Sequence, residues 1–160
     1  MMVAARHPER VGKVMVVDML PQPAGLLGSS ASNVRGLADS LQRIIASPGG
    51  GRLVETAIGL FGNRSPGDPA SDSDVVARAT HELALTDLTP ELPKIRAPMT
   101  VVYAAPGDPR LAAQARAAYT SAYGSKRGAK LVRVDNSGHM IIYEQPARFR
   151  EALKAFLKPA

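Results

Sequence analysis

The stretch PMTVVYAAPGDP, residues 98–109, decides the fold class. Its apolar centre, Met99 to Ala104, has the length and β-branched content of a strand that is buried on both faces. Proline stands at each end, and residues 110–122 then carry apolar side chains at helical spacing. The stretch therefore predicts a strand that runs into a helix, which is the unit from which parallel sheets are built.

The same alternation continues on both sides of this stretch. An apolar run at 14–17 predicts a first strand, and residues 130–134 predict a third strand, with a last helix from Pro146. Between the first two strands, residues from about 21 to 92 form a helical insert, for which the spacing predicts helices over 32–45, 53–61 and, capped by Ser73 or Asp74, up to Leu85. Strands that alternate with helices indicate the α/β class: one domain over 1–160, with a three-stranded parallel sheet flanked by helices and a helical insert between its first two strands.

Composition excludes several other classes of protein. The chain has 160 residues, of which 45% are hydrophobic and 21% charged, as in a globular domain that is large enough to bury its own core. It contains no cysteine, which excludes a disulfide framework, a thiolate zinc site and a cysteine nucleophile. We expect neither a signal peptide nor a membrane span, since no apolar run is long enough, and we expect no metal and no cofactor.

The net charge of +6 is concentrated at the carboxyl end of the chain. Residues 110–160 hold ten Lys and Arg against three Asp and Glu, with a basic cluster at Lys126, Arg127, Lys130 and Arg133. No nucleic-acid-binding motif accompanies the cluster, so a solvated basic face is the better interpretation. Nucleic acid is therefore not an expected partner.

Three polar residues follow the predicted strands, where ligands and catalytic groups gather in parallel sheets. Asp18 ends the first strand, Asp108 follows the second, and His139 follows the third. An Asp that hydrogen-bonds a His fixes the imidazole tautomer, and the imidazole can then take a proton from a nucleophile. We predict Asp108 as the partner of His139, because their strands are neighbours, with Asp18 as the second choice.

The segments around these residues resemble the α/β-hydrolase superfamily. The run AARHPERV at 4–11, before the strand that ends at Asp18, resembles the segment that follows the nucleophile of these enzymes. The run NSGHM at 136–140, followed by EQP at 144–146, resembles their catalytic-histidine loop and last helix. The resemblance implies that His139 is the base of a catalytic triad, that Asp108 is its acid, and that the insert at about 21–92 is the cap.

The sequence departs from this family at the nucleophile. No G-x-S-x-G motif occurs in the 160 residues, so the chain resembles the carboxyl-terminal half of a hydrolase. Within GSSAS at 28–32, Ser30 or Ser32 is better explained as the cap of the following helix. Ser30 is the alternative candidate for a replacement nucleophile, and Ser137 ranks lower. His7 and His81 have structural explanations, at a helix end and on the polar side of a helix.

Two functions remain open from the sequence. The first is an esterase-like hydrolase that acts on a small-molecule carboxylic ester or similar bond through Asp108 and His139, with an unidentified nucleophile. The second is a catalytically silent, truncated domain that binds a partner through its exposed sheet edge. In either case we expect a homo-oligomer that forms through the strand at 14–20, since an unpaired apolar edge is a template for another chain.

Overall fold

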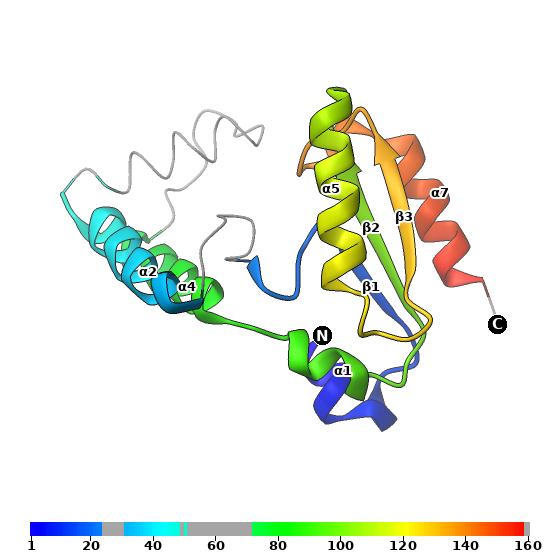
Figure 1. Ribbon diagram of the computed structural model, residues 1–160, viewed down its shortest axis with the longest axis horizontal. Coiled ribbons are helices and arrows are strands. Elements are labelled where there is room, and N and C mark those ends of the chain that lie inside the picture. Colours follow the sequence, from blue (N-terminus) through cyan, green and yellow to red (C-terminus); the bar gives the residue numbers. More distant parts are fainter. Residues whose placement is uncertain (24–30, 49, 51–71, 159–160) are drawn as a thin grey trace. The chain divides into compact units, whose positions relative to one another are not determined.

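A computed structural model describes residues 1–23, 31–48, 50 and 72–158 (Figure 1). The chain divides into two compact units. The first unit joins Met1–Pro21 to Asp87–Ala160, and the second is Gln22–Thr86. The residues on which the predicted chemistry rests, apart from Ser30, belong to the first unit.

The first unit is built on a parallel sheet of three strands. Its strands run side by side in the order β1-β2-β3, with β1 at Val14–Val17, β2 at Met99–Ala105 and β3 at Lys130–Asp135. Val101 is the central register position, since it lies opposite Val16 on β1 and Leu131 on β3. The strands point to the same end of the sheet (Figure 1). The predicted α/β class and parallel three-stranded sheet are therefore confirmed.

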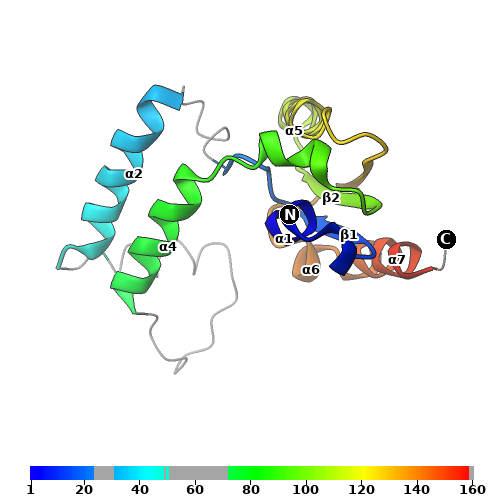
Figure 2. The same cartoon turned by 90° about the horizontal axis from the view of Figure 1, so that it is seen from below.

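Side chains of β2 alternate between two cores, as a strand covered on both faces requires. Met99, Val101 and Tyr103 face one core, which also contains Tyr119 and Tyr123 from α5 (Pro109–Ala122) and its carboxyl end. Val102 and Ala104 face the other core, together with side chains of α6 (Ile141–Glu144) and α7 (Pro146–Leu157). Figure 2 shows α5 and α7 on opposite sides of the sheet. The sheet is thus the middle layer of three.

Short helices complete the first unit. They are α1 (Met2–Arg6) and the 3-10 helices η1 (Pro8–Arg10) and η3 (Thr89–Lys94). Leu92 of η3 and Ala4 of α1 are buried in the same core as Val101. No described helix has the length and apolar character that crossing a membrane requires.

In the second unit, helix α2 (Ala31–Ala46) packs against α4 (Ser73–Leu85). The small side chains of Ala38 and Ala77 are almost fully buried, which lets the two helices approach closely. Asp72 is the N-cap of α4, where its carboxylate accepts hydrogen bonds from two backbone amides, so the prediction of Ser73 or Asp74 as the cap is wrong by one or two positions. The predicted helix at 53–61 lies outside the described residues.

Candidate functional site

Asp18 lies at the carboxyl end of β1, in a backbone conformation that few residues adopt. Its φ is 45°, in the left-handed region, which Asp tolerates better than most side chains. The carboxylate is only 12% exposed, and its Oδ1 accepts a hydrogen bond from the backbone amide of Ala104 on β2 (2.8 Å). The carboxylate is therefore a largely buried charge with fixed partners, as a buried charge requires.

His139 lies beside this carboxylate. Its Nδ1 is 2.9 Å from Oδ2 of Asp18. A carboxylate only accepts hydrogen bonds, so this contact requires Nδ1 to carry a proton, which leaves Nε2 of the neutral ring able to take one. The imidazole is 57% exposed, and Nε2 has no hydrogen-bonding partner among the described residues. The pair, which we call the Asp18–His139 dyad, has the geometry of an oriented general base.

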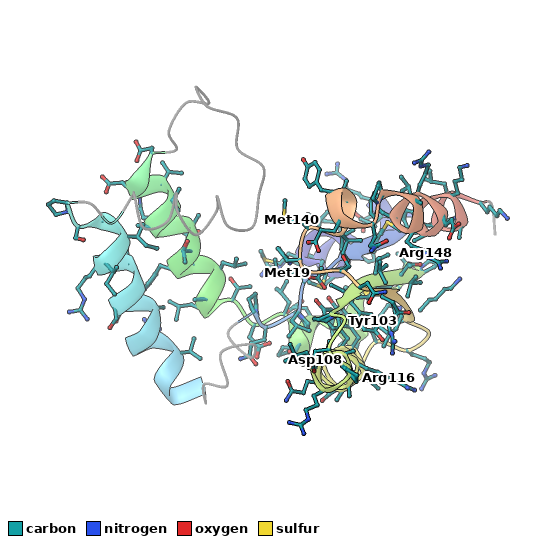
Figure 3. The ribbon with its side chains drawn as sticks, turned by 90° about the horizontal axis from the view of Figure 1, so that it is seen from above. Met19, Tyr103, Asp108, Arg116, Met140 and Arg148 are labelled. Atoms are coloured by element: carbon teal, nitrogen blue, oxygen red, sulfur yellow. The ribbon has the colours of Figure 1, made fainter. Side chains whose placement is uncertain are left out.

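Asp108, the expected partner of His139, is placed differently. It is the N-cap of α5, where its Oδ1 accepts hydrogen bonds from the amides of Arg110 (2.8 Å) and Leu111 (3.0 Å). Figure 3 shows it at the beginning of that helix. Strand order did not predict the pairing because the loop after β3 turns back over the end of β2, where the Ser137 amide donates to the Ala105 carbonyl (3.3 Å). His139 thereby reaches the second-choice residue, Asp18, at the end of the farther strand.

Glu144 holds the loop that carries His139, a contact which the sequence did not indicate. Its two carboxylate oxygens accept hydrogen bonds from the amides on either side of His139: Gly138 (2.6 Å) and Met140 (3.0 Å). A Cβ at position 138 would lie 3.1 and 3.2 Å from these oxygens, so glycine permits the close approach. The feature of the sequence that could have indicated this contact is an acidic residue directly before Gln145 and Pro146, where the last helix begins.

Two tyrosines of the α5 region also contact the segment at Asp18. The Tyr119 hydroxyl donates to Oδ1 of Asp18 (3.0 Å), and the Tyr123 hydroxyl donates to the Met19 carbonyl (2.6 Å). Burial, and then the charge of Asp18, raise the pKa of Tyr119 well above its usual range, and burial does the same to the pKa of Tyr123. Both phenols therefore remain donors at neutral pH. In the sequence, the only indication that these two tyrosines act on one segment was their separation by one helical turn.

The other candidates from the sequence do not join this site. Ser30 lies outside the described residues. Ser137 is buried, and its hydroxyl donates to the carbonyl of Gly138 (3.0 Å). His7 lies 3.8 Å from Glu9 on the surface, and His81 contacts Asp39 of α2 (2.7 Å). Among the described residues, no group of His, Asp and Glu is arranged to hold a metal ion.

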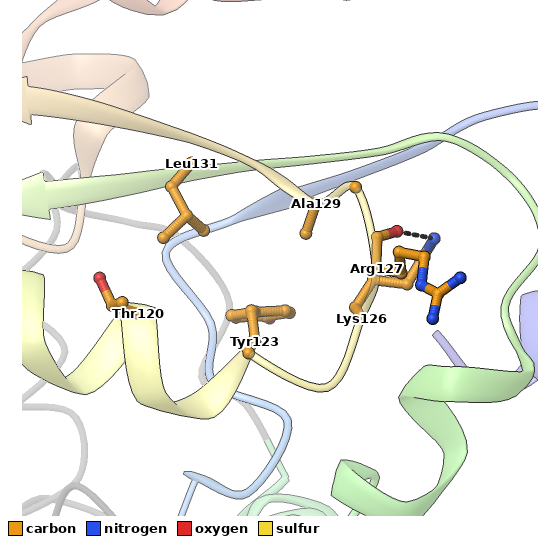
Figure 4. A pocket seen from close by; sticks show the side chains of 8 residues that line it. Thr120, Tyr123, Lys126, Arg127, Ala129 and Leu131 are labelled. Atoms are coloured by element: carbon orange, nitrogen blue, oxygen red, sulfur yellow. Dashed lines mark hydrogen bonds between the residues drawn. The ribbon is translucent and has the colours of Figure 1, made fainter.

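A separate pocket lies at the other end of the strands. It has a volume of about 250 Å³ and lies between the end of α5 and the beginning of β3 (Figure 4). Its lining residues are Thr120, Tyr123, Gly124, Lys126, Arg127, Gly128, Ala129 and Leu131. The Lys126 ammonium already donates to the carbonyl of Arg127 (3.1 Å). No member of the dyad lines this pocket, so it is distinct from the site at Asp18.

Comparisons with known proteins agree with this fold. Residues 2–152 match a family model described as the alpha/beta hydrolase family. Similar solved structures include an alpha/beta hydrolase enzyme from a Medee basin deep-sea metagenome library (18% identity, TM-score 0.57, 99% of this chain and 60% of that one). A hydrolase from Pseudomonas aeruginosa is also similar (23% identity, TM-score 0.57, 99% of this chain and 60% of that one). So is an enol-lactonase from Burkholderia xenovorans (18% identity, TM-score 0.54, 97% of this chain and 59% of that one).

At these identities the structural similarity concerns the fold alone. The chain spans about 60% of the length of these structures. No curated protein sequence matches it.

Proposed function

The chain belongs to the alpha/beta hydrolase family, and from this premise we propose that it takes part in hydrolysis of a carboxylic ester or similar bond, with His139 as the general base. The contact between Nδ1 of His139 and Oδ2 of Asp18 (2.9 Å) carries the proposal. The carboxylate orients the ring and stabilises the imidazolium that forms when Nε2 accepts a proton. The exposed ring is accessible to a nucleophile and a small-molecule substrate.

The proposed proton transfers are those of acyl transfer. A hydroxyl nucleophile attacks the ester carbonyl while its proton passes to Nε2 of His139, and the same proton then leaves with the alcohol product. Water hydrolyses the acyl intermediate in a second step, with the same base. The sequence contains no G-x-S-x-G motif and Ser137 is occupied within its own loop, so the nucleophile is left unassigned.

Hydrolysis of a short-chain aryl ester tests the proposal. We expect weak turnover by the 160-residue chain, since a triad without its serine retains little activity, and a loss of that turnover in His139→Ala. The matched control is His7→Ala, which removes another exposed histidine and should leave turnover unchanged. Turnover that is equal in wild type and His139→Ala contradicts the assignment. If robust turnover depends on His139, Ser30→Ala is the next variant.

Any in-frame coding sequence upstream of Met1 supplies a second arm of the test. A longer chain that carries G-x-S-x-G should hydrolyse the ester strongly, and His139→Ala should abolish this activity. A longer chain whose activity survives His139→Ala would refute the role of His139.

Self-association through the edge of β1 is the second candidate function. Within the described residues β1 pairs only with β2, and the amides of Val14 and Asp18 donate toward that strand. Alternation then directs the amides of Met15 and Val17 to the outer edge, where another strand can pair with them.

Light scattering at several concentrations checks this candidate. We expect a mass that rises with concentration, and a smaller rise in Val17→Pro, which removes an outward amide without removing a bond to β2. Val16 is buried in the core and is unsuitable for substitution. A constant monomer mass contradicts self-association.

A further inference from the structure

The two oxygens of the Asp18 carboxylate have different partners. Oδ2 contacts His139, whereas Oδ1 accepts from the Ala104 amide (2.8 Å) and the Tyr119 hydroxyl (3.0 Å). The backbone amide comes from β2 and the phenol from α5, so two separate elements hold Oδ1. Rotation of the carboxylate away from His139 would break both hydrogen bonds.

A second tyrosine fixes the backbone next to this carboxylate. Tyr123 donates to the carbonyl of Met19, the residue after Asp18, over 2.6 Å. Asp18 itself has a positive φ, which costs free energy for any residue with a Cβ and persists only where neighbouring contacts enforce it. Tyr119 of α5 and Tyr123 at the carboxyl end of this helix thus bind the side chain of Asp18 and the carbonyl of the next residue.

We propose that Tyr119 is a positioning residue, which holds the Asp18 carboxylate in the orientation that selects the Nδ1–H tautomer of His139. The inference rests on the proposed function for its catalytic consequence, but its structural step, from Tyr119 through Asp18 to His139, is measurable without turnover. Tyr119 does not contact the reacting atoms. Its effect on the base passes entirely through the carboxylate.

The surrounding contacts allow the hydroxyl to be tested separately from the ring. Tyr119 stacks on Tyr103, with ring centroids 4.8 Å apart, and only 5% of Tyr119 is exposed. Tyr119→Phe keeps the stacked ring and removes only the hydrogen bond to Asp18. Tyr103→Phe is the matched control, since its ring lies in the same stack and its hydroxyl makes no hydrogen bond with a described residue.

Nitrogen-15 NMR of His139 at a pH where its ring is neutral gives the direct readout. In the wild-type chain we expect the Nδ1–H tautomer to predominate. In Tyr119→Phe the ratio of Nδ1–H to Nε2–H should fall roughly five-fold, which corresponds to about 1 kcal/mol, the typical contribution of one hydrogen bond. Tyr103→Phe should leave the ratio at the wild-type value.

A double substitution distinguishes positioning from a general loosening of the core. If Tyr119 acts through Asp18, Tyr119→Phe should have no further effect on the His139 tautomer ratio in an Asp18→Asn background. An equal ratio in wild type and Tyr119→Phe, or an equal change in Tyr103→Phe, overturns the inference. So does an undiminished effect of Tyr119→Phe in the Asp18→Asn background.

Kinetics separate this inference from the proposed function. If turnover depends on His139, Tyr119→Phe should lower kcat by no more than about five-fold, because the population of the Nδ1–H tautomer changes less than the tautomer ratio. KM should stay near its wild-type value, since substrate binding does not involve the phenol. Turnover that is independent of His139 refutes the proposed function, whereas the tautomer ratio still decides whether Tyr119 positions the dyad.

Discussion

Asp108 allows a direct test of two roles, because the sequence predicted it as the catalytic acid and the structure places it at the beginning of α5. Its Oδ1 accepts hydrogen bonds from two backbone amides, those of Arg110 (2.8 Å) and Leu111 (3.0 Å). Replacement of an N-cap Asp by Ala costs about 1 kcal/mol, whereas Asn caps a helix about as well as Asp. We therefore expect Asp108→Ala to lose about 1 kcal/mol of unfolding free energy and Asp108→Asn to lose almost none.

Two measurements on the same variants check this expectation. Thermal unfolding should show a midpoint lower by roughly 4 °C for Asp108→Ala and a near-native midpoint for Asp108→Asn. Ester hydrolysis that depends on His139 should be retained in Asp108→Asn and lost in Asp18→Asn, since an amide at position 18 no longer requires a proton on Nδ1. The two variants are chemically matched, because each exchanges one carboxylate for an amide.

One result would refute this reasoning. If Asp108→Asn unfolds at the wild-type temperature but loses its turnover, whereas Asp18→Asn keeps it, Asp108 is the acid and the contact with Asp18 is only structural. A large loss of stability in Asp108→Asn would contradict the capping role.

Two further predictions concern the loop of His139 and the response to alkaline pH. Glu144→Gln leaves one side-chain oxygen to accept from two amides, so it should lower turnover that depends on His139 and broaden the NMR signals of Gly138 and Met140. The control Glu151→Gln, on the exposed face of α7, should do neither. Unchanged NMR signals in Glu144→Gln would contradict the role of Glu144. The pKa values of Tyr119 and Tyr123 are raised on folding, so the unfolded chain releases their protons first, and stability should fall as pH rises above about 10, by up to about 1.4 kcal/mol per pH unit for each tyrosine. Denaturant titrations at several pH values above about 10 should show that the unfolding free energy of Tyr119→Phe declines less steeply with pH than that of the wild-type chain. An identical decline would show that the Tyr119 phenol does not contribute.

The sequence predicted the layers of the first unit because those depend on local periodicity. The apolar run from Met99 to Ala104 and the prolines at 98 and 109 predicted the central strand and the start of α5, and both are confirmed. The fold class followed from the order of strands and helices. These features depend on residue patterns within short segments, which a single sequence contains in full.

The partner of His139 could not be derived in the same way. Strand order favours Asp108, but the path of the loop depends on residues with unusual backbone geometry: Asn136 has a φ of 54° and Asp18 a φ of 45°. The hydrogen bond between His139 and Asp18 joins positions 121 residues apart, and the hydrogen bond between Tyr119 and Asp18 joins positions 101 residues apart. Such hydrogen bonds leave no periodic trace in a single sequence.

The acid and the base of the dyad differ in how firmly the fold holds them. Asp18 is bound by an amide of the central strand and a phenol of the core, so its orientation can change only with the packing of β2 and α5. His139 is exposed on a loop that depends on the carboxylate of Glu144. Substitutions that loosen the site without unfolding the sheet should therefore act mainly through the histidine loop, and the orientation of Asp18 should persist until the core itself is perturbed.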